Sequence, residues 1–183
     1  MQLSRKEQKL KIRKPVPIRD KNVLFTMKIK KISIRKTDTD YLKQGIEEYE
    51  TRIKRFIPFE SIRIPAAKSS SQMNVNITKG KEAEKVMHYL APSDFVVLLD
   101  EKGKELRSVE FADFLRAKFN SSIKTLVFVT GGPFGFDDSL KTRADFMLSL
   151  SKMTFSHQMV RLFFSEQLYR ALTILNNESY HHE

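Results

Sequence analysis

The sequence predicts an α/β fold in which a mostly parallel sheet carries helices on both of its faces. Short apolar runs alternate with helix-like stretches along the chain, an order typical of parallel strands joined by helical crossovers. Two runs, residues 95–99 (FVVLL) and 126–129 (LVFV), are apolar throughout, which is typical of strands buried on both faces. No internal repeat or low-complexity linker divides the chain, so residues 27–183 are expected to form one domain.

The first half of that domain is expected to contain two strands and two helices. Residues 28–34 (KIKKISI) carry β-branched side chains and predict the first strand, and residues 60–64 predict the second. Between them, a stripe of apolar residues at helical spacing predicts a helix that Pro58 ends. The stripe consists of Leu42, Ile46, Tyr49, Ile53 and Phe56. The small, polar residues 66–80 predict a loop, and a helix is expected over about 79–90.

The second half is expected to contain three strands and two helices. The strand at 95–99 should end in a turn at Lys102-Gly103-Lys104, after which Ser108 is placed to cap a helix. That helix carries Phe111, Phe114, Leu115 and Phe119. Residues 126–129 and 146–150 predict the last two strands, and a long helix follows over about 156–175. Apolar residues on most sides of this helix indicate a subunit interface as well as an intramolecular one.

The charge and composition exclude several classes of protein. The 183 residues carry a formal net charge of +11, which favours an anionic partner such as a nucleic acid. No apolar run approaches the ~20 residues that span a bilayer. The chain has no Cys and no secretory signal at its start, so we expect a cytoplasmic protein without disulfides or thiolate chemistry.

Residues 1–26 stand apart from the domain. They hold eight basic and two acidic residues but few large apolar ones, so this extension is expected to be disordered. It is either an arm that binds nucleic acid or sequence upstream of a natural start at Met27.

Glycines mark the candidate site. Three of the six glycines, Gly131, Gly132 and Gly135, fall in the segment TGGPFG directly after the apolar run at 126–129. Ligands of open α/β sheets bind at the carboxyl ends of strands, where glycine lets the backbone approach closely. A tight turn between strand and helix is the alternative interpretation. Neither a phosphate-binding loop nor a dinucleotide fingerprint is present.

Three of the four histidines lie near the C-terminus. His157 falls at the start of the long helix, and His181 and His182 lie in the polar tail. Their spacing matches no metal-binding motif, so no metal is expected.

Four segments in this order resemble the RlmH family of SPOUT-class methyltransferases, which act on a pseudouridine of the large ribosomal RNA. They are residues 130–135 (TGGPFG), 148–161 (LSLSKMTFSHQMVR), 166–171 (EQLYRA) and the terminal Tyr180-His181. The similarity runs from Met27 to the C-terminus. His182 and Glu183 depart from the family pattern, in which a basic residue often follows Tyr-His, and Ser179 stands where proline is frequent.

The resemblance implies a fold with a C-terminal trefoil knot and a homodimer packed through the long final helix. It also implies that S-adenosyl-L-methionine binds between the knot loops. The residues that match the family's cofactor contacts are Leu99, Gly131, Leu150, Ser151, Lys152, Met153, Thr154 and Phe155. Gly131 and Gly132 are expected to leave room for the cofactor because they have no side chain.

The implied reaction is methylation of N3 of a pseudouridine in 23S ribosomal RNA, within the large subunit or the assembled ribosome. Since N3 carries a proton, His157 or His181 is expected to act as the base, with the tail reaching the partner's site. Tyr180 is expected to stack on the extruded base. Arg161 and Arg170 would contact RNA phosphate or have a structural role, such as an ion pair with Glu166.

Two other functions fit the same residues. The first is a non-catalytic RNA-binding or ribosome-assembly factor with a vestigial cofactor site. The second is a small-molecule enzyme with a nucleotide-like ligand at the glycine turn, which the basic charge and the missing phosphate-binding loop disfavour.

Overall fold

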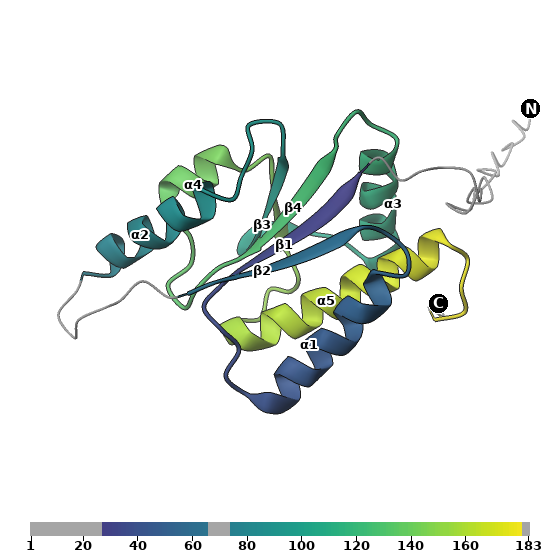
Figure 1. The fold of residues 1–183 in the computed structure, drawn as a ribbon, viewed down its shortest axis with the longest axis horizontal. Helices are drawn as coiled ribbons and strands as arrows, with labels where there is room; N and C mark the ends of the chain where they lie inside the picture. The colour runs from purple at the N-terminus through teal and green to yellow at the C-terminus, as the bar shows by residue number, and fades with distance from the viewer. Residues whose placement is uncertain (1–26, 66–73, 181–183) are drawn as a thin grey trace, which may run out of the picture.

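The computed structural model describes residues 27–65 and 74–180, which form a five-stranded parallel sheet with helices on both faces (Figure 1). The strands are β1 (Lys28–Ile34), β2 (Phe59–Ile64), β3 (Phe95–Glu105), β4 (Thr125–Thr130) and β5 (Phe146–Ser149). The helices are α1 (Asp40–Ile53), α2 (Val75–Met87), α3 (Ser108–Phe119), α4 (Asp138–Arg143) and α5 (His157–Leu175). The strand order is β2-β1-β4-β3-β5, so the predicted fold class is confirmed.

Each face of the sheet has its own core, because successive side chains of a strand point to opposite faces. Leu126 and Phe128 of β4 pack with residues of α1, α3 and α5. Val127 and Val129 pack on the other face with residues of α2 and α4. β4, predicted as buried on both faces, is therefore covered on both. Figure 1 shows α1 and α5 side by side beneath the sheet.

A buried polar network ties β1 and β2 to the α1–α5 layer. Lys31 Nζ lies 2.6 Å from Glu50 Oε1 and donates a hydrogen bond to Ser165 Oγ at 2.9 Å. Ser61 Oγ donates to the same Glu50 oxygen at 2.8 Å. Burial lowers the pKa of Lys31, and the Glu50 carboxylate opposes this shift. The charge pair joins β1 to α1, and each charge compensates the burial of the other. The hydrogen bond from Lys31 to Ser165 adds α5 to the network.

The turn predicted at Lys102-Gly103-Lys104 is wrong, because β3 continues to Glu105. Leu99 and Lys104 both pair with Leu148 of β5, so residues 100–103 bulge out between two pairings with the same residue. A Cβ atom added at Gly103 would lie 2.6 Å from the carbonyl carbon of Met147. The glycine thus serves a close approach of two strands and not a chain reversal.

The loop predicted over 66–80 is wrong from residue 75 onward, because α2 begins at Val75 and ends at Met87. Asn74 caps this helix, and its side-chain oxygen accepts a hydrogen bond from the backbone N–H of Asn76 at 2.9 Å. The small polar residues that suggested a loop form the first turns of a helix whose buried face includes Thr78.

Three further details differ from the prediction. Arg107, not Ser108, is the N-cap of α3; the Glu110 side chain accepts from the Arg107 backbone N–H, and the Ser108 hydroxyl donates to Gln167. Helix α1 ends at Ile53, so Phe56 lies in the turn beyond it. The short helix α4 was not predicted, because six residues carry too little periodicity to be recognised.

Several predictions fall outside this description. The extension 1–26, the segment 66–73 and residues 181–183 lie outside the described residues, so the expected disorder of the extension stays a prediction. The trefoil knot also stays a prediction. Within 27–65 and 74–180, no helix is both long enough and apolar enough to cross a membrane.

Candidate active site

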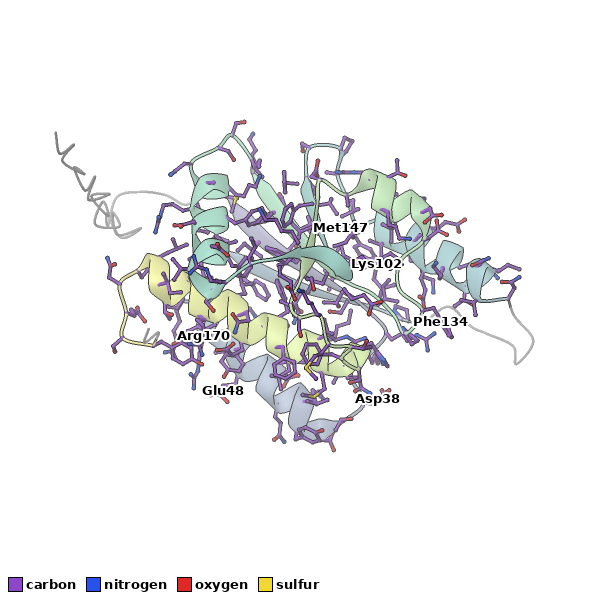
Figure 2. The ribbon with its side chains drawn as sticks, turned by 180° about the vertical axis from the view of Figure 1, so that it is seen from behind. Asp38, Glu48, Lys102, Phe134, Met147 and Arg170 are labelled. Atoms are coloured by element: carbon purple, nitrogen blue, oxygen red, sulfur yellow. The ribbon has the colours of Figure 1, made fainter. Side chains whose placement is uncertain are left out.

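A cavity of about 750 Å³ opens at the carboxyl ends of β3, β4 and β5. Three segments form most of its lining: residues 99–102 at the β3 bulge, the loop 131–136 after β4, and parts of 147–160 from β5 to the first turn of α5. Figure 2 labels Lys102, Phe134 and Met147, one lining residue from each segment. The position follows the rule that α/β sheets bind ligands beyond the carboxyl ends of neighbouring strands, as the glycine motif predicted.

Seven of the eight residues expected at the cofactor line this cavity. They are Leu99, Gly131, Leu150, Ser151, Met153, Thr154 and Phe155. Lys152 is not among the lining residues, and its side chain is exposed. Leu99, Leu148 and Leu150 supply apolar walls beside exposed backbone of the loops, and the volume lies in the range of small-molecule sites.

The segment after β5 is folded back by two serines. The Ser149 hydroxyl donates to the carbonyl oxygen of Ser151 at 2.9 Å, and the Ser151 hydroxyl accepts from the backbone N–H of Met153 at the same distance. These bonds turn the chain so that Met153, 74% exposed, stands at the mouth of the cavity.

The glycine loop packs closely on neighbouring side chains of the protein. A Cβ atom at Gly131 would lie 3.2 Å from the Phe136 ring, and one at Gly132 would lie 2.9 Å from Glu82 Oε2. Gly135 has φ of +73° and donates its N–H to the Gly132 carbonyl oxygen at 3.2 Å. The missing side chains therefore let the loop pack on its own protein neighbours. Gly131 and Gly132 also line the cavity, and the expectation that they leave room for the cofactor stays a prediction.

His157 is the one predicted base that the described residues place in the cavity wall. It is the first residue of α5, which Ser156 caps by accepting from the backbone N–H of Met159 at 3.3 Å. Burial lowers the pKa of His157, and the positive charges of Arg161 and Arg35 lower it further against the opposing effect of Asp38. The imidazole is therefore neutral near pH 7 and able to accept a proton.

Arg161 lies one turn along α5 and is buried. Its guanidinium donates to the carbonyl oxygen of Ile34 at 2.5 Å and to the Thr37 hydroxyl at 2.9 Å. Burial lowers its pKa to about 10, which leaves it charged at neutral pH. These contacts tie the carboxyl end of β1 to α5 and favour the structural alternative for this residue.

Tyr180 lies away from the cavity of its own protomer. Its hydroxyl donates to Glu166 Oε1 at 3.3 Å and lies 3.4 Å from the Tyr49 hydroxyl, and burial raises its pKa. The Arg170 guanidinium lies 4.8 Å from the centre of the Tyr180 ring and forms an ion pair with Glu166 at 2.6 Å. These contacts favour the structural alternative for Arg170, and the stacking of Tyr180 on an extruded base stays a prediction. His181 lies outside the described residues.

Sequence reasoning missed several lining residues. Asp100, Glu101 and Lys102 reach the cavity because β3 bulges where a turn was expected. Lys79 and Lys141 come from helices on the α2–α4 face. A polar stretch directly after the apolar run at 95–99 was the available signal for the first three; nothing in the local pattern marks the two lysines.

No cluster of three or more His, Cys, Asp or Glu residues suited to a metal ion occurs within residues 27–65 and 74–180.

Comparison with known proteins identifies the family. A family model described as "Predicted SPOUT methyltransferase" matches residues 27–181. The relative named ribosomal RNA large subunit methyltransferase H from Parabacteroides distasonis is 51% identical over 157 residues, 86% of this chain and 100% of its own length. The protein of the same name from Christiangramia forsetii is 50% identical over 156 residues, 85% of this chain and 99% of its own.

A third relative of that name, from Bacteroides thetaiotaomicron, is 47% identical over 157 residues, again 86% of this chain and its entire length. The matched region contains the β3 bulge, the glycine loop, the folded-back segment after β5 and His157, all of which line the cavity. The chain belongs to the SPOUT methyltransferase family, among the ribosomal RNA large subunit methyltransferase H proteins.

Proposed function

We propose that this protein transfers a methyl group from S-adenosyl-L-methionine to N3 of a pseudouridine in 23S ribosomal RNA. The observation that carries the proposal is the cavity at the carboxyl ends of β3, β4 and β5, which places a neutral imidazole on a wall shared with the glycine loop. The relatives' name supports a large-subunit ribosomal RNA as the substrate. The net charge of +11 suits a polyanionic partner.

The cavity suits this cofactor in size and chemistry. Its volume of about 750 Å³ accommodates a nucleoside with an amino-acid tail. Leu99, Leu148 and Leu150 would hold the adenine ring, while backbone groups of the loops after β4 and β5 offer hydrogen bonds to its edge. When bound there, S-adenosyl-L-methionine supplies a methyl group on a positively charged sulfur, which needs no metal to react.

The protein's own task is to remove the N3 proton and to align the acceptor. A nitrogen of the neutral His157 ring accepts that proton as N3 attacks the methyl carbon, so negative charge does not build up on the pseudouridine ring. The hydrogen bonds of Ser149 and Ser151 fix the turn that carries Met153 in the cavity lining, which restricts the directions from which a nucleobase can enter. Arg161 holds α5, and with it His157, against the end of β1.

The proposed active unit is a homodimer. Phe163 on the outer side of α5 is 39% exposed, and its ring lies 4.9 Å from that of Phe155 in the cavity wall. A second copy packed on this helix would cover that surface and bring its own tail toward the cavity. Since Tyr180 is docked on α1 and α5 of its own chain, His181 is the tail residue we expect at the partner's site. The reaction is proposed to take place in the cytoplasm.

Two measurements test the proposed function. Titration calorimetry in the presence of a chelator should give one S-adenosyl-L-methionine per protomer, and the absence of binding heat at micromolar protein would count against it. Transfer of labelled methyl groups to naked 23S RNA, to large subunits and to whole ribosomes then identifies the substrate form. Binding of RNA without transfer to any of the three would favour the non-catalytic alternative.

A further inference from the structure

Glu82 is a buried carboxylate with an unusual position behind the cavity wall. It lies on α2, is 1% exposed, and its Oε1 atom lies 3.4 Å from the Nε atom of Arg35. Its Oε2 atom is buried without a hydrogen-bond partner. A carboxylate is expensive to bury unless its charge is compensated, so a glutamate at this position has to be explained by what it contacts.

The nearest feature of the cavity is the glycine loop. A Cβ atom at Gly132 would lie 2.9 Å from Glu82 Oε2, closer than Cβ atoms come to other heavy atoms in folded proteins. The loop backbone therefore rests directly on the carboxylate, while the neighbouring Gly131 rests on the Phe136 ring. Gly131 and Gly132 both line the cavity, so these two supports set the position of one of its walls.

Arg35 connects this support to a third part of the protein. It follows β1, whose last pairing with β4 joins Ser33 to Thr130, so Arg35 and the glycine loop lie at the same edge of the sheet. Its φ of +74° lies in the left-handed region, where a non-glycine residue is strained. From this position the Arg35 side chain reaches Glu82, and the pair links the end of β1, α2 and the loop after β4.

We propose that Glu82, paired with Arg35, is a positioning residue for the Gly131–Gly132 wall of the cavity. It acts through the loop backbone, and it sets the affinity for the nucleoside ligand without touching the reacting atoms. This inference rests on the proposed cofactor, but its effect on the loop is measurable without any ligand.

The test compares Glu82→Gln with Glu84→Gln, a matched change at an exposed glutamate of the same helix. In Glu82→Gln the dissociation constants for S-adenosyl-L-methionine and S-adenosylhomocysteine should rise together by about tenfold, with kcat at saturating cofactor within about twofold of the unchanged protein. Gly132→Ala, which presses a methyl group against the carboxylate, should weaken both ligands in the same way. Glu84→Gln should change none of these values.

Three results would overturn the inference. A fall in melting temperature with unchanged affinity would reduce Glu82 to a stabilising residue. A loss for S-adenosyl-L-methionine alone would mean that the carboxylate senses the charged sulfur directly. Unchanged affinity and stability would remove any role. If Glu82→Gln does not fold, Arg35→Gln tests the pair from its more exposed side, with the same tenfold expectation.

Hydrogen exchange separates this inference from the proposed function. In the ligand-free protein, amides of residues 131–135 should exchange faster in Glu82→Gln than in Glu84→Gln, whatever the ligand is. If the unchanged protein binds no S-adenosyl-L-methionine but the two variants still differ in exchange, the proposed function fails while the positioning role stands. Equal exchange in the two variants would contradict the positioning role itself.

Discussion

His157 is the residue on which the proposed chemistry depends most directly. Replacement by Asn keeps a polar side chain at the start of α5 but removes the proton acceptor. We expect kcat at saturating substrates to fall by about 100-fold or more, the contribution of a general base, while cofactor affinity changes little. Steady-state methyl transfer and calorimetry on the same variant measure the two quantities; a retained kcat would assign the base to another group.

The environment of His157 also predicts the pH dependence. Burial and the nearby Arg161 and Arg35 lower the pKa of His157 from the ordinary histidine value of about 6.5. The ring therefore stays neutral at a pH of about 6.5 and takes up its proton only at a lower pH. The rate should therefore hold as pH falls through 6.5 and decline below the lowered pKa. NMR titration of the His157 ring should give the same midpoint, and a midpoint above 6.5 would contradict the assigned environment.

At this scale the sequence was informative about which residue types matter and less so about why. His157 and seven of the eight residues expected to contact the cofactor line the cavity. The glycine motif did not reveal that a Cβ atom at Gly131 would also lie 3.2 Å from the Phe136 ring. Contacts between α2 and the loop after β4, such as Glu82 on Gly132, join residues 50 positions apart, and no local pattern reveals them.

Among the elements, the bulge of β3 is the feature that most changes the expected site. Gly103→Ala would place a methyl group 2.6 Å from the Met147 carbonyl carbon, and backbone cannot move aside as a side chain can. We expect a loss of about 2 kcal/mol or more in the free energy of unfolding, measured by urea denaturation.

Gly80→Ala is the control for that prediction. Gly80 lies inside α2 with no atom within 4 Å of an added Cβ, so the same substitution should stabilise the protein by about 0.5–1 kcal/mol. Similar effects of the two substitutions would show that β3 does not approach β5 as described.

Element types were predicted better than element ends. The two runs of apolar residues at 95–99 and 126–129 identified central strands because burial on both faces leaves no room for polar side chains. The extension of β3 to Glu105 was missed because its last residues are polar and exposed, and its pairing with β5 is decided by a tertiary contact. The start of α2 was missed because Val75 and Ile77 in its first turn are exposed and add no buried apolar stripe, and the residues around them are polar.

For the whole molecule, the exposed apolar side of α5 predicts association. Sedimentation at micromolar concentration should show a dimer, and Phe163→Glu should shift it toward the monomer, because a charge would then have to be buried in the interface. A monomer in the unchanged protein would contradict the dimer and would leave the tail without a partner site.

The extension 1–26 gives a second prediction at this scale. A chain shortened to residues 27–183, the region that the family model covers almost completely, should methylate at an unchanged rate at saturating RNA. If the eight basic residues of the extension contact RNA, the slope of log affinity against log salt becomes shallower on their removal. A collapse of the saturated rate would mean that the extension helps to build the site.

The central claim is methylation of N3 of a ribosomal pseudouridine, and nucleoside mass spectrometry tests it most directly. Ribosomal particles lacking the modification are incubated with the protein and S-adenosyl-L-methionine carrying a deuterated methyl group, and their 23S RNA is digested and analysed. The account predicts a labelled N3-methylpseudouridine that is absent without the protein and strongly reduced with His157→Asn. A labelled methyl group on any other nucleoside, or none at all while the cofactor binds, would contradict it.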